Sequence, residues 1–200
     1  MSVMGKIFYI FGKSASGKDC IFRHIKEEES LNLQGITLYT TRPRRISETD
    51  RKEYIFISEE ELKAFQDAEK VIELRTYQTM HGPWSYGMMD DGQIDLANQD
   101  YLVVGVLESY VSTRDYFGTD KVVPLYIEVE DGERLSRALR REGKQEIPRY
   151  AEMCRRFLAD SEDFSEERLA AAGITKRYYN HDLEQCLNEI RAEIRAHKSN

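Results

Sequence analysis

The chain has 200 residues, 40% of them hydrophobic and 32% charged, and a formal net charge of −7. This length suits one compact α/β domain with a sizeable core, and the acidic balance argues against a general nucleic-acid binder, because phosphate backbones need positive surface. No apolar run approaches the roughly 20 residues that a membrane span needs, and the first residues lack the charged, apolar and cleavage segments of a signal peptide.

The first predicted elements are a strand, a glycine loop and a helix. Residues 6–11 form an apolar run of strand length, and residues 19–29 place apolar side chains near one face of a helix, as at the start of a βαβ unit. Further strands are expected at residues 101–107, 122–127 and, more weakly, 174–179. Continuous apolar runs separated by helical stretches predict a parallel β-sheet flanked by helices on both faces.

Two other segments have a different character. Residues 40–92 alternate in hydrophobicity and are rich in aromatic and charged residues, which predicts a small, mostly antiparallel insert. Residues 133–166 form an arginine-rich helical stretch that Gly143 and Pro148 interrupt, and an amphipathic helix is expected over residues 182–197.

The strongest motif follows the first strand and matches the phosphate-loop pattern G-x-x-x-x-G-K. Its candidate ATP-binding residues are Gly12, Lys13, Ser14, Ala15, Ser16, Gly17, Lys18 and Asp19. Glycines let the backbone wrap around phosphate oxygens, and the following helix contributes its N-terminal dipole. Lys18 supplies a mobile positive charge for the β and γ phosphates and is a candidate catalytic residue. The alternative is a glycine-rich turn that matches by chance.

Asp19 occupies the position where this motif usually has a Ser or Thr that contacts Mg²⁺. A carboxylate is also a hard oxygen ligand, so Asp19 could meet Mg²⁺ directly or through water. It could equally be an acid that interacts favourably with the helix N-terminus. The sequence leaves both readings open.

A cation cluster marks the beginning of the insert. The run Thr40-Thr41-Arg42-Pro43-Arg44-Arg45 places three arginines within four positions. Guanidinium groups bind phosphate bidentately, and Tyr54 can add a hydroxyl. The alternative is a solvated charge run on the surface.

Several motifs in this order resemble the guanylate kinase family over nearly the whole chain. That family carries T-T-R-x-x-R-x-x-E with a tyrosine nine residues after the second arginine, an acidic residue that closes a strand, G-x-x-Y-G, and N-x-D-L near the C-terminus. The matching residues here are Thr40, Thr41, Arg42, Arg45, Glu48, Tyr54, Glu73, Tyr86, Gly87, Asn180, Asp182 and Leu183, with a few extra residues between Glu73 and Tyr86.

The resemblance implies a fold and an activity. The fold would be a P-loop NTPase-type core formed by residues 1–37, 97–135 and 170–200, with a small mixed or antiparallel nucleoside-monophosphate-binding insert over residues 38–96 and a helical lid over residues 136–169. The activity would be transfer of the γ-phosphoryl group of ATP to GMP or dGMP, which gives ADP and GDP or dGDP, with Mg²⁺ as cofactor.

The resemblance also implies roles for individual residues. Arg42, Arg45, Tyr54 and Tyr86 would hold the acceptor phosphate, with Arg45 also catalytic, and Glu73 would accept hydrogen bonds from the N1 and N2 edge of guanine. Asn180 would lie beside the adenine of ATP.

In the lid, Arg137 and Arg141 keep the family's four-residue spacing, and Arg156 resembles a later arginine of the family. Arg141 and Arg156 are the lid candidates for catalysis. For any one lid arginine, the alternative is an exposed helix with ion pairs between residues i and i+4.

Four positions depart from the family pattern at the base-reading end. Leu38 replaces a serine, Met88 replaces a Ser or Thr, and Gly105 and Leu107 fall where the family has two aspartates, with Glu108 one step away. Guanine specificity is therefore expected to rest mainly on Glu73. A kinase of the same fold with another phosphorylated acceptor, and a non-catalytic guanylate-kinase-like binding module, stay as alternatives.

The expected partners are ATP and GMP or a related nucleoside monophosphate, without nucleic acid or membrane, for a monomer or small homo-oligomer. The three cysteines, Cys20, Cys154 and Cys186, are scattered and lack metal-ligand spacing. They favour a reducing, cytoplasmic setting.

Overall fold

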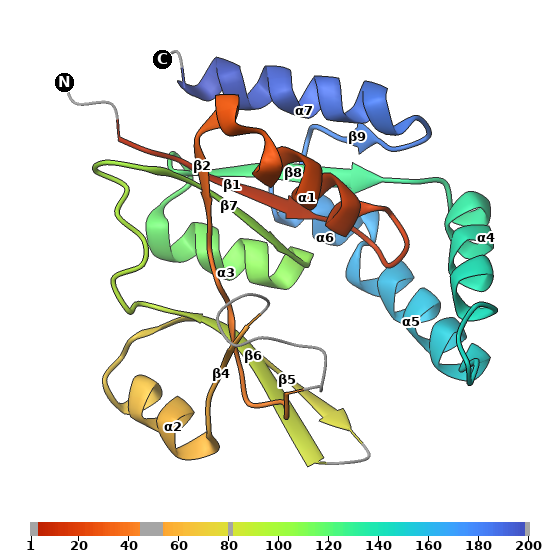
Figure 1. The fold of residues 1–200 in the computed structure, drawn as a ribbon, viewed down its shortest axis with the longest axis horizontal. Helices are drawn as coiled ribbons and strands as arrows, with labels where there is room; N and C mark the ends of the chain where they lie inside the picture. Colours follow the sequence, from red (N-terminus) through yellow and green to blue (C-terminus); the bar gives the residue numbers. More distant parts are fainter. Residues whose placement is uncertain (1–3, 45–53, 80–81, 199–200) are drawn as a thin grey trace.

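The computed structural model describes residues 4–44, 54–79 and 82–198. These residues form two separate β-sheets with helices around them (Figure 1). The larger sheet has the strand order β2 (Leu33–Gly35), β7 (Asp100–Gly105), β1 (Ile7–Phe11), β8 (Val122–Glu128) and β9 (Tyr178–Tyr179). Each neighbouring pair is parallel, so the predicted parallel sheet is confirmed.

The strands differ from the predicted ones in three details. The short β2 carries no clear periodic signal and was not predicted. Strand β7 ends at Gly105 because Leu107 already begins a helix, and β9 covers only two residues of the expected 174–179.

Successive side chains of the central strand β1 point to opposite faces of this sheet and belong to two core clusters, one on each face. Phe8 and Ile10 pack with α1 (Lys18–Glu27) and α7 (Leu183–Lys198). Tyr9 and Phe11 belong to the opposite core cluster, which also includes residues of the helices on that face. Those helices are α3 (Leu107–Phe117) and α6 (Glu166–Ala171). Figure 1 shows α1 and α7 on one side of the sheet and α3 on the other.

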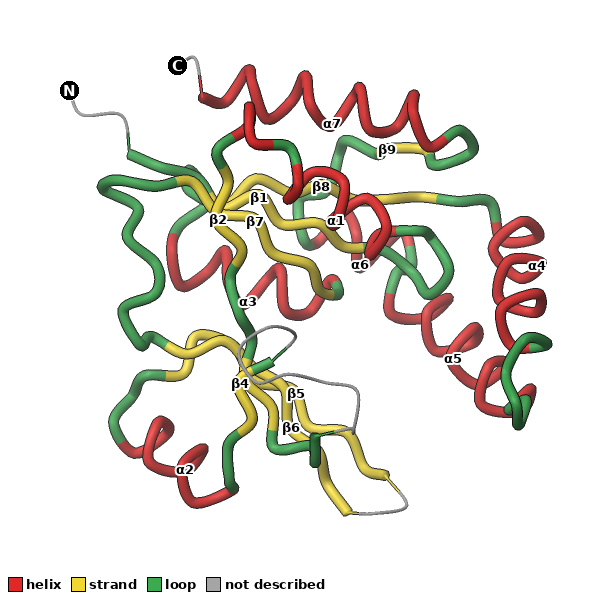
Figure 2. The backbone as a smooth tube through the Cα atoms, viewed as in Figure 1, coloured by secondary structure: helices red, strands yellow, loops and turns green. Residues whose placement is uncertain are grey.

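The smaller sheet is mixed rather than purely antiparallel. Its strand order is β4 (Ile55–Phe56), β3 (Tyr39–Thr40), β6 (Gly82–Met89) and β5 (Val71–Thr79). Strands β3 and β4 are parallel and the other two pairs are antiparallel. Helix α2 (Glu59–Asp67) begins with a capping box at Ser58 and Glu61, and it packs Leu62 against this sheet. The tube in Figure 2 shows this unit apart from the larger sheet.

The arginine-rich stretch forms two long helices before α6. Helices α4 (Asp131–Glu142) and α5 (Tyr150–Asp163) extend away from the larger sheet, and a short 3₁₀ helix, Glu29–Leu31, follows α1 (Figure 1). None of the described helices is long and apolar enough to cross a membrane. The domain boundaries given above stay predictions.

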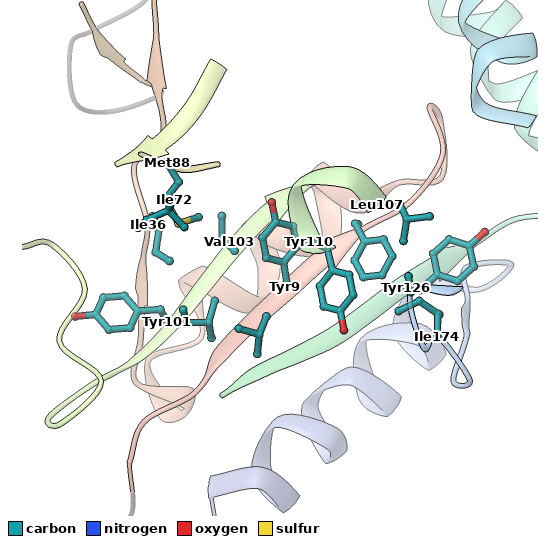
Figure 3. Packing of buried hydrophobic residues seen from close by; sticks show 14 of the residues in the cluster. Tyr9, Ile36, Ile72, Met88, Tyr101, Val103, Leu107, Tyr110, Tyr126 and Ile174 are labelled. Carbon is teal, nitrogen blue, oxygen red and sulfur yellow. The ribbon is translucent and has the colours of Figure 1, made fainter. Parts of the chain in front are cut away.

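The two sheets share one apolar cluster. Ile36, Ile72 and Met88 lie together beside Val103 of β7, as Figure 3 shows. Leu38 packs against the same cluster. The apolar residues at positions 38 and 88, which depart from the family pattern, therefore contribute to the core that joins the smaller sheet to the larger one.

Candidate functional site

The phosphate loop connects the carboxyl end of β1, the central strand, to the first residue of α1. Ligands in parallel sheets bind at this edge. Ala15 and Gly17 both have left-handed backbone conformations, with φ of 63° and 87°. A left-handed non-glycine residue stores strain that is typical of functional sites. A side chain at Gly12 would place its Cβ 2.5 Å from the carbonyl oxygen of Ile127, so only glycine fits there.

Three side chains from distant elements hold this loop. The side-chain amide of Asn180 donates to the carbonyl of Ser16 at 2.8 Å. The N–H of Ser14 donates to Oδ2 of Asp160 at 2.8 Å, and Arg134 donates both to that carboxylate at 3.0 Å and to the Ser14 carbonyl at 3.3 Å. Asn180 was predicted to lie beside adenine, and here its side chain supports the loop.

Asp160 and Arg134 were missed by sequence reasoning. They lie 146 and 120 residues from Ser14 in the chain, so no local pattern links them to it. Arg134 is almost fully buried, and its guanidinium lies 4.1 Å from the ring centroid of Phe157. The pair ties α4 and α5 to the phosphate loop.

The polar side chains of the loop differ in burial and in their partners. The buried hydroxyl of Ser16 has no hydrogen-bond partner in the part of the chain that the structure describes. Lys18 is the half-buried first residue of α1, and no ion pair is recorded for it among the described residues. Asp19 is exposed in the first turn, whereas the ammonium of Lys13 lies 3.4 Å from a carboxylate oxygen of Asp131.

The two lid candidates come together. Arg141 and Arg156 line one cavity of about 120 Å³ between α4 and α5, which Ser14 of the phosphate loop also lines. Arg156 donates to Glu152 at 2.8 Å. Hydrogen bonds from Arg155 and then Arg156 hold the pKa of Glu152 at about 2, so this carboxylate stays charged. The catalytic roles of Arg141 and Arg156 stay predictions.

The predicted phosphate-binding residues of the acceptor side are aromatic and cationic. Arg42 is buried, with its guanidinium carbon 5.9 Å from the ring centroid of Tyr54 and 5.6 Å from that of Phe56. The rings of Tyr54 and Tyr86 lie 5.7 Å apart. Burial, reinforced by Tyr86, raises the pKa of Tyr54, so its hydroxyl stays a donor.

Arg45, a predicted phosphate-binding and catalytic residue, and Glu48, a residue of the same motif, lie outside the described residues. The role of Arg45 stays a prediction.

Glu73, the residue predicted to read the base, is held by Arg75, which sequence reasoning missed. Nε and Nη2 of Arg75 donate to the two carboxylate oxygens of Glu73 at 3.1 and 3.2 Å. Burial raises the pKa of Glu73, Arg75 opposes that rise, and the charge of Glu108 adds to it. Burial is the largest single influence on the pKa of Arg75 and would lower it, but the charge and hydrogen bonds of Glu73, together with Tyr9 and Tyr77, outweigh burial and the pKa rises. We call Arg42, Tyr54, Glu73, Arg75 and Tyr86 the acceptor cluster.

The structure explains the glycine at position 105. A Cβ there would lie 2.4 Å from the hydroxyl oxygen of Tyr9 and 2.6 Å from that of Ser109. These two hydroxyls are hydrogen-bonded at 2.7 Å and fill the space of a side chain. Leu107, the second aspartate position of the family pattern, is buried in the core.

A family model described as guanylate kinase matches residues 4–88. The guanylate kinase of Porphyromonas gingivalis is 23% identical over 194 residues, which cover 96% of this chain and 97% of that protein. That of Dechloromonas aromatica is 27% identical over 202 residues, 96% of this chain and 89% of the relative. That of Mycoplasma mobile is 39% identical over 69 residues, 34% of each chain.

The fold agrees with these similarities. The crystal structure of a guanylate kinase from Anaplasma phagocytophilum superposes with a TM-score of 0.63 at 18% identity, covering 98% of this chain and 87% of that one. Its likeness concerns the fold alone. The family model matches the first part of the chain, and the two relatives match nearly its full length at 23% and 27% identity. The chain is therefore similar to guanylate kinases in sequence and in fold.

Proposed function

We propose that this chain is a nucleoside monophosphate kinase that transfers the γ-phosphoryl group of ATP to GMP or dGMP, giving ADP and GDP or dGDP. The observation that carries the proposal is the phosphate loop, whose Lys18 has no ion pair among the described residues. A lysine ammonium without a carboxylate partner at a helix N-terminus is free to meet phosphate oxygens.

On the donor side, the backbone N–H groups of the loop and the start of α1 would bind the phosphates of ATP. Lys18 would stabilise the charge on the transferring group, and Arg141 and Arg156 would approach from the lid. Phosphoryl transfer needs positioning and charge neutralisation more than covalent chemistry. Closure over both nucleotides would exclude water, which otherwise hydrolyses ATP.

Asp19 is the residue that fits Mg²⁺. Its carboxylate is exposed, lies in the first turn of α1, and has no recorded ion pair among the described residues. The described residues contain no cluster of three or more potential ligands. One carboxylate suits this ion, which in kinases takes one or two carboxylates, substrate phosphates and water. When bound, Mg²⁺ neutralises charge on the phosphates.

On the acceptor side, Arg42, Tyr54 and Tyr86 would bind the phosphate of the monophosphate, with Arg45 as a further partner. A buried guanidinium that lies against aromatic rings is held in place before the phosphate arrives. That preorganisation favours a phosphorylated acceptor over water.

Two observations favour a second candidate, a kinase for another phosphorylated acceptor. Glu73 is already hydrogen-bonded to Arg75, and Met88 belongs to the apolar core, against which Leu38 packs. The non-catalytic module fits less well, because it would have no use for a phosphate loop with an uncommitted lysine.

The test is ADP formation in a coupled assay with GMP, dGMP, IMP, AMP, CMP and UMP. We expect turnover with GMP and dGMP, and a loss of about 10²–10³-fold in kcat for Lys18→Ala. Lys26→Ala, on the same helix and outside the site, is the matched control and should keep full activity. Absence of acceptor-dependent ADP with the whole panel would refute the kinase proposal, and faster turnover of AMP, CMP or UMP than of GMP would favour the second candidate.

A further inference from the structure

The acceptor cluster contains a buried ion pair at the position where a guanine base would be read. The side chains of Glu73 and Arg75 are only 1% and 10% exposed, and the guanidinium contacts both carboxylate oxygens. The two residues are two apart on β5, so their side chains lie on the same face of the strand. Arg75 lies directly opposite Tyr86 on β6, which places the pair beside the phosphate end of the cluster.

Arg75 presents to Glu73 the same pattern of donors that guanine presents. The N1–H and N2–H groups of guanine sit on an N–C–N unit, and the Nε–Cζ–Nη2 edge of arginine is also an N–C–N unit with a donor on each nitrogen. Both fit a carboxylate bidentately at the same edge. Glu73 therefore cannot bind guanine through that edge while Arg75 occupies it.

The surroundings hold the pair in place. Gly87 lets β5 and β6 approach closely at Glu73, because a Cβ at Gly87 would lie 2.5 Å from the carbonyl oxygen of Glu73. Removing Arg75 from Glu73 would leave a buried carboxylate unpaired, which is costly. The hydroxyl of Tyr9 fills the space that a side chain at position 105 would need. Position 105 therefore cannot provide a second carboxylate that would pair with Arg75 in place of Glu73.

Arg75 still has donors to offer. A guanidinium has five N–H groups, and Arg75 gives two of them to Glu73, with no other hydrogen bond in the described part of the chain. The three remaining N–H groups can meet an acceptor atom such as the carbonyl oxygen of a base. An amino group at the same place on the base would be a donor facing a donor.

We propose that Arg75 is a specificity-determining residue of the acceptor site: it occupies the edge of Glu73 that guanine would use, so the site reads a base carbonyl through Arg75 and ignores the 2-amino group of guanine. The substrates are monophosphates of 6-oxopurines, GMP and IMP alike, and AMP is disfavoured. This inference rests on the proposed kinase function.

The experiment compares kcat/KM for GMP, IMP and AMP in the wild type and in Arg75→Met. In the wild type we expect GMP and IMP to agree within about threefold, since the 2-amino group goes unread. In Arg75→Met the edge of Glu73 is free, and GMP should exceed IMP by about tenfold or more, as for a hydrogen bond to a charged group. The assays are run at pH 8, because burial raises the pKa of Glu73 and a higher pH favours the carboxylate that would accept from guanine.

Two controls make the result specific. Glu73→Gln added to Arg75→Met should bring the ratio of GMP to IMP back to within about threefold. Arg168→Met alters an arginine of α6 that pairs with Asp163 on the surface, and it should keep the wild-type ratio. If Arg75→Met does not fold, Arg75→Lys keeps the charge without the two-point contact, and its ratio should still move towards GMP.

A wild type that prefers GMP to IMP by more than tenfold, or a ratio unchanged in both Arg75 variants, would overturn the inference and leave the kinase proposal intact. Absence of ADP formation with all six acceptors of the earlier panel would instead refute the kinase proposal. Calorimetric binding of GMP and IMP, measured without ATP, then decides the role of Arg75 independently of turnover: equal affinities support it, and a tenfold preference for GMP overturns it.

Discussion

The phosphate loop and the acceptor cluster differ in what holds their recognition groups in place. In the loop, the groups that would meet phosphate are backbone N–H groups, and their directions follow from left-handed residues such as Ala15 and Gly17. In the acceptor cluster the recognising groups are side chains, and each lies where its packing neighbours allow. Backbone geometry changes only when the whole loop changes, whereas a side-chain site can be altered one residue at a time.

The base end of the acceptor cluster illustrates such replacement. Met88 belongs to the core that joins the two sheets, the hydroxyl of Tyr9 takes the space at Gly105, and Arg75 takes the edge of Glu73. Each of these residues fills a position that the family pattern gives to base recognition. The phosphate end keeps Arg42 between aromatic rings. The predicted phosphate end therefore keeps its arginine between aromatic rings, whereas other groups fill the positions of the predicted base end.

The largest expected effect concerns the loop. In Gly17→Ala the new Cβ would lie 2.3 Å from the amide nitrogen of Asn180, at a φ of 87°. Left-handed strain and the loss of the hydrogen bond from Asn180 to Ser16 together should lower the free energy of unfolding by about 2–4 kcal/mol. Chemical denaturation measures this loss, and the activity should fall with it.

Gly173→Ala is the matched control for this substitution. Gly173 has a φ of 75° but no heavy atom within 4 Å of its Cβ position, so only the left-handed strain of about 1–2 kcal/mol applies. Equal losses in the two variants would show that the contact with Asn180 contributes nothing.

The next effect tests the phosphate end of the acceptor cluster. Arg42→Ala removes a buried guanidinium, and we expect KM for the monophosphate to rise about 10–100-fold, as for charge-assisted hydrogen bonds. KM for ATP should change less than about threefold, since the donor site is separate. Arg44→Ala, which alters an exposed neighbour, should raise the acceptor KM less than fivefold by the same principle. A comparable rise of both KM values in Arg42→Ala would contradict separate donor and acceptor sites.

The difference between the phosphate loop and the acceptor cluster also explains how much could be predicted from the sequence. The loop from Gly12 to Asp19 was found because its requirements are local: a strand, glycines at fixed spacing and a helix. The parallel sheet and the mixed insert were also predicted, because continuous and alternating apolar runs differ in sequence. Strand β2 was missed, since its three residues are too few to show a period.

The missed site residues act over long separations or through packing. Asp160 and Arg134 reach the phosphate loop from more than a hundred residues away, and nothing near Ser14 indicates them. The occupation of the Gly105 site by Tyr9 likewise depends on the register of β1 with β7. Arg75 left a usable signal: it follows Glu73 by two residues in a strand, which places both side chains on one face.

A smaller effect tests the filled space at Gly105. Gly105→Ala should lower the free energy of unfolding by about 1–2 kcal/mol, because its Cβ would overlap the hydroxyls of Tyr9 and Ser109. In the Tyr9→Phe background one overlap is gone, and the cost should fall by about 0.5 kcal/mol or more. Denaturation of the four proteins of this cycle measures the coupling. Strict additivity would show that Tyr9 does not keep a side chain out of position 105.

The last and smallest effect is a pH dependence at the base end. Burial raises the pKa of Glu73 in the folded protein above its ordinary value of 4.5. A carboxyl with a raised folded pKa contributes stability that is fully present below the unfolded pKa and is lost as the pH rises through the folded pKa. The stability of the wild type relative to Glu73→Gln should therefore decrease as the pH rises from about 4 to 7.

Glu152 provides the opposite control for this pH dependence. Its pKa is lowered to about 2 by Arg155 and Arg156, so its contribution is present above the unfolded pKa and is lost as the pH falls towards 2. The stability of the wild type relative to Glu152→Gln should therefore increase from pH 2 to pH 5. Unfolding by urea across this pH range measures both differences. The contrary result would be a stability difference between the wild type and Glu73→Gln that increases with pH, as it does for Glu152. That result would show that the hydrogen bonds from Arg75 outweigh burial at Glu73, and that separating the two side chains for guanine costs correspondingly more free energy.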